Sequence, residues 1–349
     1  MRRIVVGVLI LSAAGGAFAA KQLIGRPAGS LAVDVAGRTV HVRKGTTLGE
    51  AMTRFALRPH PGDVLDVNGR PVRRGAVRGR VLVNGRSAAH ALGLRAGDSI
   101  TVVDGHSRRE ALTRRVTRVR GGMPTDPQFS VAYARGEEIV VRGALSHELV
   151  SAHFHADGPA TVRKVVALTF DDGPWPSSTG RILNELRRLH VRATFFVIGY
   201  LAQQYPELVR RELRLGMVVG NHSYNHPQVP PFDQLPIPLL RDEIGLNQRI
   251  LTRLGVRTHL FRPPGGSVSP SVVRAAEAVG DRVVLWSVDP TDWQPGVSAA
   301  RVAQRVLSSV RPGSIVILHD GGGDRSATLA ALPRIVKGIR ARGLRFVVL

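Results

Sequence analysis

The chain has 349 residues, 49 Lys and Arg against 26 Asp and Glu, a formal net charge of +23, and no cysteine. This length allows two domains and a large core. The lack of cysteine excludes disulfides and a lipid-modified N-terminal Cys. The charge favours anionic partners such as wall polymers or a membrane surface. Nucleic acid is not expected, because no basic stripe with interleaved aromatic residues and no nucleic-acid motif occurs.

The N-terminus has the features of an export signal. Arg2 and Arg3 precede an apolar stretch over residues 4–20, and Ala17-Phe18-Ala19 has the small-x-small form of a signal-peptidase site. The stretch is also just long enough for a tilted membrane span. Residues 1–20 are therefore predicted to be a signal peptide or a membrane anchor, and a buried core helix is disfavoured by the arginines. Both favoured readings place the rest of the chain outside the cytoplasm, secreted or anchored and associated with the cell wall.

Residues 21–30 read as a linker, and residues 31–105 as a small α+β module. Apolar alternation predicts a hairpin over 31–42 and strands at 81–83 and 99–103, and helical spacing covers 46–57. The pattern resembles the β-grasp (ubiquitin-like) modules of exported wall proteins. No residue in it points to chemistry, so a spacer role is favoured.

Residues 106–163 form a basic connecting segment with further strand-like runs, such as 138–141. Its basic cluster comprises Arg108, Arg109, Arg114, Arg115, Arg118 and Arg120. The cluster either binds an anionic wall polymer or lipid headgroups, or is a solvated face, which is slightly favoured.

From residue 164 to 349 strands alternate with helices. The predicted strands are 165–170, 194–198, 217–220, 258–261, 283–287, 314–318 and 345–348. The predicted helices are 178–190, 200–214, 233–254, 269–279, 298–310 and 327–341. Such alternation indicates an α/β fold with a parallel sheet. A closed barrel and an open doubly wound sheet both fit seven strands.

Polar residues follow five of these strands at their C-terminal ends. They are Asp171 and Asp172; His222 and His226; Arg262; Asp289 and Asp292; and His319 with Asp320. In parallel β/α folds the loops after the strand C-termini share one face, and that face carries the active site. These residues are therefore predicted to converge.

Two imidazoles in this set, His222 and His226, are four residues apart. On a helical turn they would share a face, which is a common way to present two metal ligands. A carboxylate from another loop would complete a three-ligand site. Three protein ligands leave a position for water, as in catalytic rather than structural zinc sites.

A hydrolase also needs a base, an oxyanion donor and an acid. One of the adjacent aspartates can bind metal while the other acts as base, paired with Arg262. The loop Pro263–Gly266 can offer a backbone N–H. His319 can be the acid, with Asp289 or Asp292 setting its charge state.

Five ordered motifs in residues 164–349 resemble the polysaccharide deacetylases with a NodB homology domain, carbohydrate esterase family 4. They are Thr169-Phe170-Asp171-Asp172-Gly173-Pro174, His222-Ser223-Tyr224-Asn225-His226, Arg262-Pro263-Pro264-Gly265-Gly266, Asp289-Pro290-Thr291-Asp292-Trp293 and Ile317-Leu318-His319-Asp320. The resemblance covers about half of the chain. It implies a distorted (β/α)7 barrel.

The resemblance also implies roles for the site residues. Asp172, His222 and His226 look like the metal ligands. Asp171 looks like the catalytic base, oriented by Arg262.

The remaining roles follow in the same way. His319 looks like the general acid, tuned by Asp292, and Trp293 and Leu318 look like walls of the acetyl pocket. Gly265 stands where the family usually has an aromatic residue, often Tyr. Its backbone N–H can still serve the oxyanion, but the aromatic surface beside the substrate is lost.

The sequence thus predicts an exported metal-dependent N-deacetylase of an N-acetylated wall polysaccharide. Peptidoglycan is the leading substrate and chitooligosaccharide another. The cofactor is one divalent ion, with zinc favoured over Co²⁺, Ni²⁺ or Mn²⁺. An O-acetyl esterase using the same site is the near alternative. A non-catalytic wall-binding protein is disfavoured, because a binding module does not need an open metal site.

Overall fold

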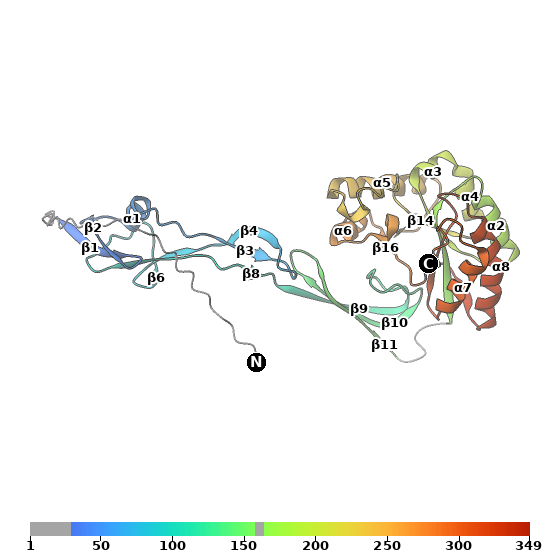
Figure 1. The fold of residues 1–349 in the computed structure, drawn as a ribbon, viewed down its shortest axis with the longest axis horizontal. Helices are drawn as coiled ribbons and strands as arrows, with labels where there is room; N and C mark the ends of the chain where they lie inside the picture. Colours follow the sequence, from blue (N-terminus) through green and yellow to red (C-terminus); the bar gives the residue numbers. More distant parts are fainter. Residues whose placement is uncertain (1–28, 158–163) are drawn as a thin grey trace. The chain divides into compact units, whose positions relative to one another are not determined.

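The computed structural model describes residues 29–157 and 164–349 (Figure 1). The chain divides into two compact units, one running to Val64 and including Arg73–Arg108, the other combining Leu65–Val72 with Arg109–Leu349. The predicted export segment 1–20 lies outside the described residues. Within the described ranges, no helix has the length and apolar character needed to cross a bilayer. The domain boundaries drawn from the sequence stay predictions.

The first unit is built on a five-stranded sheet in the order β2-β1-β7-β5-β6. Its elements are β1 (Ser30–Val35), β2 (Arg38–Arg43), α1 (Leu48–Arg54), β5 (Arg80–Val83), β6 (Arg86–Ser87) and β7 (Ser99–Val103). The β1–β2 hairpin turns at Ala36 and Gly37, both with positive φ, as two-residue hairpin loops require. Thr47 and Glu50 form a capping box at the start of α1. The likeness of this module to β-grasp domains stays a prediction.

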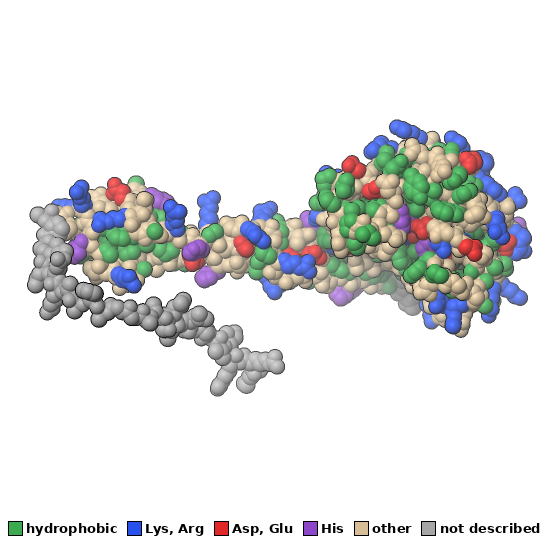
Figure 2. All heavy atoms as spheres, turned by 45° about the horizontal axis from the view of Figure 1, so that its top comes forward, with side chains coloured by type: hydrophobic (Ala, Val, Ile, Leu, Met, Phe, Trp, Pro, Cys, Tyr) green, Lys and Arg blue, Asp and Glu red, His purple; other side chains and the backbone are tan. Residues whose placement is uncertain are grey.

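Two three-stranded sheets follow. One has the order β4-β3-β8, formed by β3 (Gly62–Leu65), β4 (Pro71–Val77) and β8 (Arg108–Arg109). The other is antiparallel, in the order β11-β10-β9, formed by β9 (Leu112–Gly122), β10 (Ala134–Gly143) and β11 (Leu149–Ala156). The predicted basic cluster lies on β8 and β9. Lys and Arg side chains are spread widely over the face drawn in Figure 2.

The second unit contains a seven-stranded parallel sheet. Its strands are β12 (Val165–Gly173), β13 (Thr194–Val197), β14 (Val218–Asn221), β15 (Leu260–Phe261), β16 (Arg282–Val283), β17 (Ile315–His319) and β18 (Arg345–Val347). The order is β16-β15-β14-β13-β12-β17, and β18 also pairs with β12. Residues 165–171 are buried on both faces of the sheet, which explains why the strand reads as a continuous apolar run.

The residues after β16 bring the two ends of this sheet together. Val284 N–H donates to the Phe261 carbonyl of β15 at 2.8 Å. Four residues later Val288 forms a parallel bridge with Val316 of β17. The same stretch of chain therefore contacts both edges of the sheet, which favours the predicted barrel over an open doubly wound sheet.

Seven helices of the described chain surround the sheet. They are α2 (Thr179–Arg188), α3 (Gly199–Gln204), α4 (Pro206–Arg214), α5 (Ile237–Arg253), α6 (Pro270–Ala278), α7 (Ala299–Ser309) and α8 (Ser326–Ala341). Two 3-10 turns, η1 (Phe232–Gln234) and η2 (Pro264–Gly266), lie in the loops. Neighbouring helices contact one another in the order α6-α5-α3-α4-α2-α8-α7, so they form a continuous layer (Figure 1).

Two of the predicted helices differ in the structure because of prolines. The helix predicted over 200–214 is two helices, because Pro206 lacks an N–H and disfavours helical geometry at Tyr205, whose ψ is 56°. The helix predicted over 233–254 begins only at Ile237, after Pro236. The predicted strand 283–287 is also shorter, because the chain leaves β15 after Val284 to reach β17.

We expect Phe170→Ala to lower the free energy of unfolding by about 3–5 kcal/mol. Phe170 is completely buried, and its ring stacks on Phe195 with centroids 5.0 Å apart. Leu239→Ala, at a half-exposed position on α5, should change that free energy by no more than about 0.5 kcal/mol. Urea unfolding of the three proteins measures both values. Equal stability of the two variants would contradict the core described here.

Candidate active site

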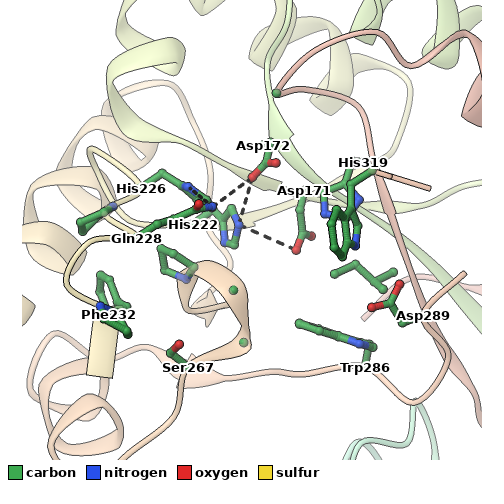
Figure 3. A pocket seen from close by; sticks show the side chains of 18 of the residues that line it. Asp171, Asp172, His222, His226, Gln228, Phe232, Ser267, Trp286, Asp289 and His319 are labelled. Atoms are coloured by element: carbon green, nitrogen blue, oxygen red, sulfur yellow. Dashed lines mark hydrogen bonds and ion pairs between the residues drawn. The ribbon is translucent and has the colours of Figure 1, made fainter. Parts of the chain in front are cut away.

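A cavity of about 580 Å³ lies at the C-terminal ends of the parallel strands. Its lining includes Asp171, Asp172, His222, His226 and His319 (Figure 3). Asp171, Asp172 and His319 lie at the C-terminal ends of β12 and β17, and His222 and His226 follow β14, so the ends of these strands meet at one cavity as predicted.

Three side chains form a group that can hold a metal ion. Asp172 Oδ1 lies 3.3 Å from His222 Nε2 and 3.2 Å from His226 Nε2. Figure 3 shows the three side chains pointing toward one another. Asp172 Oδ1 is buried without a hydrogen-bond partner among the described residues, which is costly unless a cation meets it. One carboxylate and two imidazoles are ordinary zinc ligands, so the residues fit a divalent ion.

The ring orientation of His222 suits this role. Its Nδ1–H donates to the Arg262 carbonyl at 2.6 Å, so Nε2 carries the free lone pair on the side of Asp172. Hydrogen bonding of the second ring nitrogen is how proteins fix the tautomer of metal-binding histidines.

Electrostatics keep Asp172 and His226, but not His222, in forms that bind cations. Burial disfavours the charged form of Asp172, but the imidazoles of His222 and His226 outweigh it and lower the pKa of that carboxyl. Burial and the neighbouring His222 lower the pKa of His226 to about 4, so this imidazole is neutral. Burial also opposes the imidazolium of His222, but the Asp171 and Asp172 carboxylates raise its pKa, so a bound cation would compete with a proton there.

The prediction that His222 and His226 share a helical turn is wrong. The five residues from His222 to His226 form an irregular loop after β14, and Ser223 and His226 have φ of 64° and 54°. A left-handed conformation at these residues is unusual and is held by surrounding contacts. The two imidazoles converge through this loop and not through helical spacing.

Helix α5 supplies those contacts. Asn247 Nδ2 donates to the Ser223 carbonyl at 2.9 Å. Glu243 Oε2 accepts the backbone N–H of Tyr224 at 3.0 Å and of Asn225 at 2.8 Å. Sequence reasoning did not identify Asn247 and Glu243, because they lie in an ordinary amphipathic helix and reach the loop only through the fold.

Asp171 is held by a buried arginine. Arg262 is completely buried, and its Nη1 donates to Asp171 Oδ1 and to Thr169 Oγ1, both at 2.7 Å. Its guanidinium lies 4.0 Å from the centre of the Phe196 ring. The second oxygen, Asp171 Oδ2, is 3.8 Å from His222 Nε2, so it faces the metal group.

His319 is bound by Asp292 and not by Asp289. His319 Nδ1 lies 2.7 Å from Asp292 Oδ1, and Asp292 Oδ2 accepts the His319 backbone N–H at 2.9 Å and the Thr328 hydroxyl at 2.7 Å. Burial opposes the charged form, but Asp292 outweighs it and raises the pKa of His319 to about 9. Asp289 lines the cavity and accepts the Thr291 N–H.

The predicted walls of the acetyl pocket are only partly where the sequence placed them. Trp293 lines the cavity and is 48% exposed, and Gly265 lines it with φ of 61°. Leu318 is completely buried in the core and does not line the cavity, whereas Ile317 does. Strand side chains alternate between faces, so Ile317 shares a face with His319 and Leu318 points the other way.

The structure adds Trp286 to the lining, a residue that sequence reasoning did not identify. Asp320, in the last predicted motif, lies behind the cavity and is completely buried beside Thr179, with which it forms a hydrogen bond. Burial raises the pKa of Asp320 to about 7. Next to it, Gly321 passes so close to the Asp172 backbone that a Cβ would lie 1.9 Å from the Asp172 carbonyl oxygen. Only glycine fits there, because a larger residue would displace a candidate metal ligand.

Comparison with known proteins identifies the family. A family model described as polysaccharide deacetylase matches residues 158–284. A peptidoglycan-N-acetylglucosamine deacetylase of Bacillus cereus is 40% identical over 187 residues, which is 53% of this chain and 85% of that protein. The chain belongs to the polysaccharide deacetylase family. Deacetylases of this family are metalloenzymes, in agreement with the donor group Asp172, His222 and His226.

Two further relatives agree with this assignment. A chitooligosaccharide deacetylase of Sinorhizobium fredii is 39% identical over 190 residues, covering 51% of this chain and 86% of that protein. A solved structure of a peptidoglycan N-acetylglucosamine deacetylase with a bound N-oxidanyl-benzamide has a TM-score of 0.50 and 37% identity, covering 53% of this chain and 86% of that one. Deacetylases of this family have a (β/α)7 barrel-like fold, in agreement with the curled parallel sheet of residues 164–349.

We expect the Asp171→Asn and Asp172→Asn variants to lose activity for different reasons. The amide introduced by Asp171→Asn would keep the hydrogen bond from Arg262 but could not take a proton, so turnover should fall by about 10²–10⁴-fold with the metal retained. The Asp172→Asn variant should lose the metal together with the activity. Metal content per chain, measured by mass spectrometry, distinguishes the two variants. Metal loss in Asp171→Asn with retention in Asp172→Asn would mean that the two roles are exchanged.

The pKa of His319 predicts how the deacetylation rate changes at alkaline pH. If the protonated imidazole is required, the rate should fall as pH rises through about 9. Asp292→Asn removes the charge that raises this pKa, so the decline should move to lower pH. Asp289→Asn should leave the pH of the decline in place, because Asp289 does not contact His319. A decline that moves with Asp289 and not with Asp292 would contradict the assignment.

Proposed function

We propose that this polysaccharide deacetylase removes N-acetyl groups from a wall polysaccharide, with peptidoglycan as its substrate. One observation carries the proposal: a single cavity combines a three-ligand metal group, an arginine-paired carboxylate and an aspartate-paired imidazole. A metal-dependent hydrolase of amides uses a metal site for the water, a base and an acid, and these groups can supply all three. The names of the relatives from Bacillus cereus and Sinorhizobium fredii support an N-acetylated glycan as substrate.

We propose zinc as the ion held by Asp172, His222 and His226. A donor set of two imidazole nitrogens and one carboxylate suits zinc, and Co²⁺, Ni²⁺ or Mn²⁺ are alternatives for the same ligands. When bound, such an ion acts as a Lewis acid and makes a water molecule acidic enough to react near neutral pH.

Asp171 and His319 carry out the two proton transfers of the reaction. Asp171, held at Oδ1 by Arg262, takes a proton from the attacking water at Oδ2 as the oxygen–carbon bond forms at the acetamide carbonyl. The Gly265 N–H donates to the carbonyl oxygen as it becomes negative. His319 donates its Nε2 proton to the nitrogen as the C–N bond breaks, since Nδ1 is held by Asp292. Acetate and a free amine leave.

The remaining walls of the cavity suit a small acyl group beside a sugar. Ile317 and Trp286 offer apolar surface for the acetyl methyl, and Trp293 offers a half-exposed ring for a sugar face. At Gly265 no side chain extends over the cavity entrance, so contacts on that side differ from those of relatives with an aromatic residue.

We also propose that the protein is exported and acts at the cell wall, secreted or anchored. The basis is the sequence of residues 1–20, with two arginines followed by an apolar run. The β-grasp-like module over residues 31–105 would act as a spacer. The basic cluster on β8 and β9 would contact an anionic wall polymer or the membrane surface. Recovery of the intact chain from the cytoplasm would contradict export.

We expect the purified enzyme to release acetate from peptidoglycan fragments and to leave free amines on their sugars. Mass spectrometry of the glycan products and an acetate assay measure the two products in parallel. Asp171→Asn is the matched control, because it should keep the metal. Acetate released without free amines would instead identify an O-acetyl esterase. Metal-loaded enzyme without acetate release from peptidoglycan or chitooligosaccharide would contradict the proposed function.

A further inference from the structure

Arg325 is a cation in the active-site cavity that the proposed reaction does not use. It lies immediately before α8, is 7% exposed and lines the cavity together with Asp172 and His319. Its Nε donates to the Gly321 carbonyl at 2.6 Å and its Nη2 to the Gly322 carbonyl at 3.1 Å. Two N–H groups of the guanidinium are therefore held by the loop that carries it.

Arg325 forms no ion pair in the described residues, and the nearby Asp324 is exposed and accepts from Ser326. No Asp or Glu oxygen of residues 29–157 and 164–349 lies within 4.0 Å of its guanidinium, and Nη1 has no hydrogen-bond partner there. The other buried arginine of the site, Arg262, has Asp171 at 2.7 Å. A guanidinium that is more than nine-tenths buried without an anion is costly, so this one is expected to meet an anion when the cavity is filled.

The position of Arg325 limits where that anion sits. A methyl group added to Gly322 would lie 3.2 Å from Arg325 Nη2 and 3.0 Å from Asp172 Oδ2. The guanidinium and the candidate metal ligand therefore flank the same glycine. An anion bound to Arg325 would share the cavity with the acetamide group that reacts, and a substrate anion there would belong to the same sugar or to its neighbour.

We propose that Arg325 binds a carboxylate carried by the substrate. Carboxylates match the planar donor edge of a guanidinium, which favours Arg over Lys for their recognition. Peptidoglycan carries carboxylates on its muramic acid and peptide parts, whereas chitooligosaccharides carry none. Arg325 is then a specificity-determining residue that selects the anionic glycan. This inference rests on the proposed N-deacetylase function and narrows its substrate class.

The test compares two tetrasaccharides that differ only in their lactyl ethers. One is N-acetylchitotetraose, and the other alternates N-acetylglucosamine with N-acetylmuramic acid bearing free carboxylates. For Arg325→Gln, the ratio of kcat/KM for the muramic over the chitin tetrasaccharide should fall about 10- to 100-fold, mainly through KM, because a charge-assisted hydrogen bond is lost. Arg325→Lys should restore part of the ratio, since it returns the charge without the planar edge.

A matched control removes a nearby charge outside the cavity. Arg181 is exposed on α2 and lies near the same loop, since the pKa of Asp324 is lowered mainly by hydrogen bonds from Ser326 and further by Arg181 and Arg325. Arg181→Gln should leave the substrate ratio unchanged. Metal content and the thermal unfolding midpoint of each full-length variant show whether the loop and the ligand Asp172 are intact. Calorimetric binding of the muramic tetrasaccharide gives a second readout that needs no turnover.

Several outcomes would overturn the inference. An unchanged ratio in Arg325→Gln, or an equal loss on both substrates together with metal loss, would make Arg325 a structural support of its loop. Weaker inhibition by acetate with an unchanged ratio would assign the site to the released product. These results leave the proposed function in place. Wild-type enzyme that deacetylates neither tetrasaccharide would count against the proposed function. In that case, calorimetric binding of the muramic tetrasaccharide to the wild-type and Arg325→Gln proteins would still test whether Arg325 binds a carboxylate.

Discussion

The site depends on one buried guanidinium. Arg262 is completely buried, and its side chain donates to Asp171 and Thr169 of β12 and to the carbonyl of Val284 after β16. Its own carbonyl accepts the Nδ1–H of His222. One residue therefore positions the candidate base and fixes the tautomer of a candidate metal ligand. A buried charge is tolerable only because these partners satisfy it, so the loops around it have little freedom to move apart.

Much of this arrangement could be predicted from the sequence because parallel strands impose it. The apolar runs end in polar residues, and the C-terminal ends of such strands share one face. That constraint brings Asp172, His222 and His226 together although they lie up to 54 residues apart in the chain. The pairing of His319 with Asp292 rather than Asp289 was left open, because both aspartates lie in the same loop and only the fold shows which carboxylate reaches the imidazole.

The features that the sequence did not predict depend on local geometry. Spacing four residues apart suggested a helical turn for His222 and His226, but their loop is held in left-handed conformations by α5. Ile317, and not the predicted Leu318, lines the cavity. Neighbouring side chains of β17 point to opposite faces of the sheet, so an error of one residue selects the wrong face. Arg325 gave no signal among so many arginines, because only the fold shows that it is buried at the cavity and forms no ion pair with the described residues.

The central claim is that Asp172, His222 and His226 bind the ion that the reaction requires, while Asp171 stays free to act as base. A crystal structure of the zinc-loaded enzyme, with anomalous scattering recorded at the zinc edge, tests this claim most directly. The account predicts one ion at about 2.0–2.2 Å from Nε2 of both histidines and from an Asp172 carboxylate oxygen. An ion bound by Asp171 in place of Asp172, or bound outside this cavity, would contradict it.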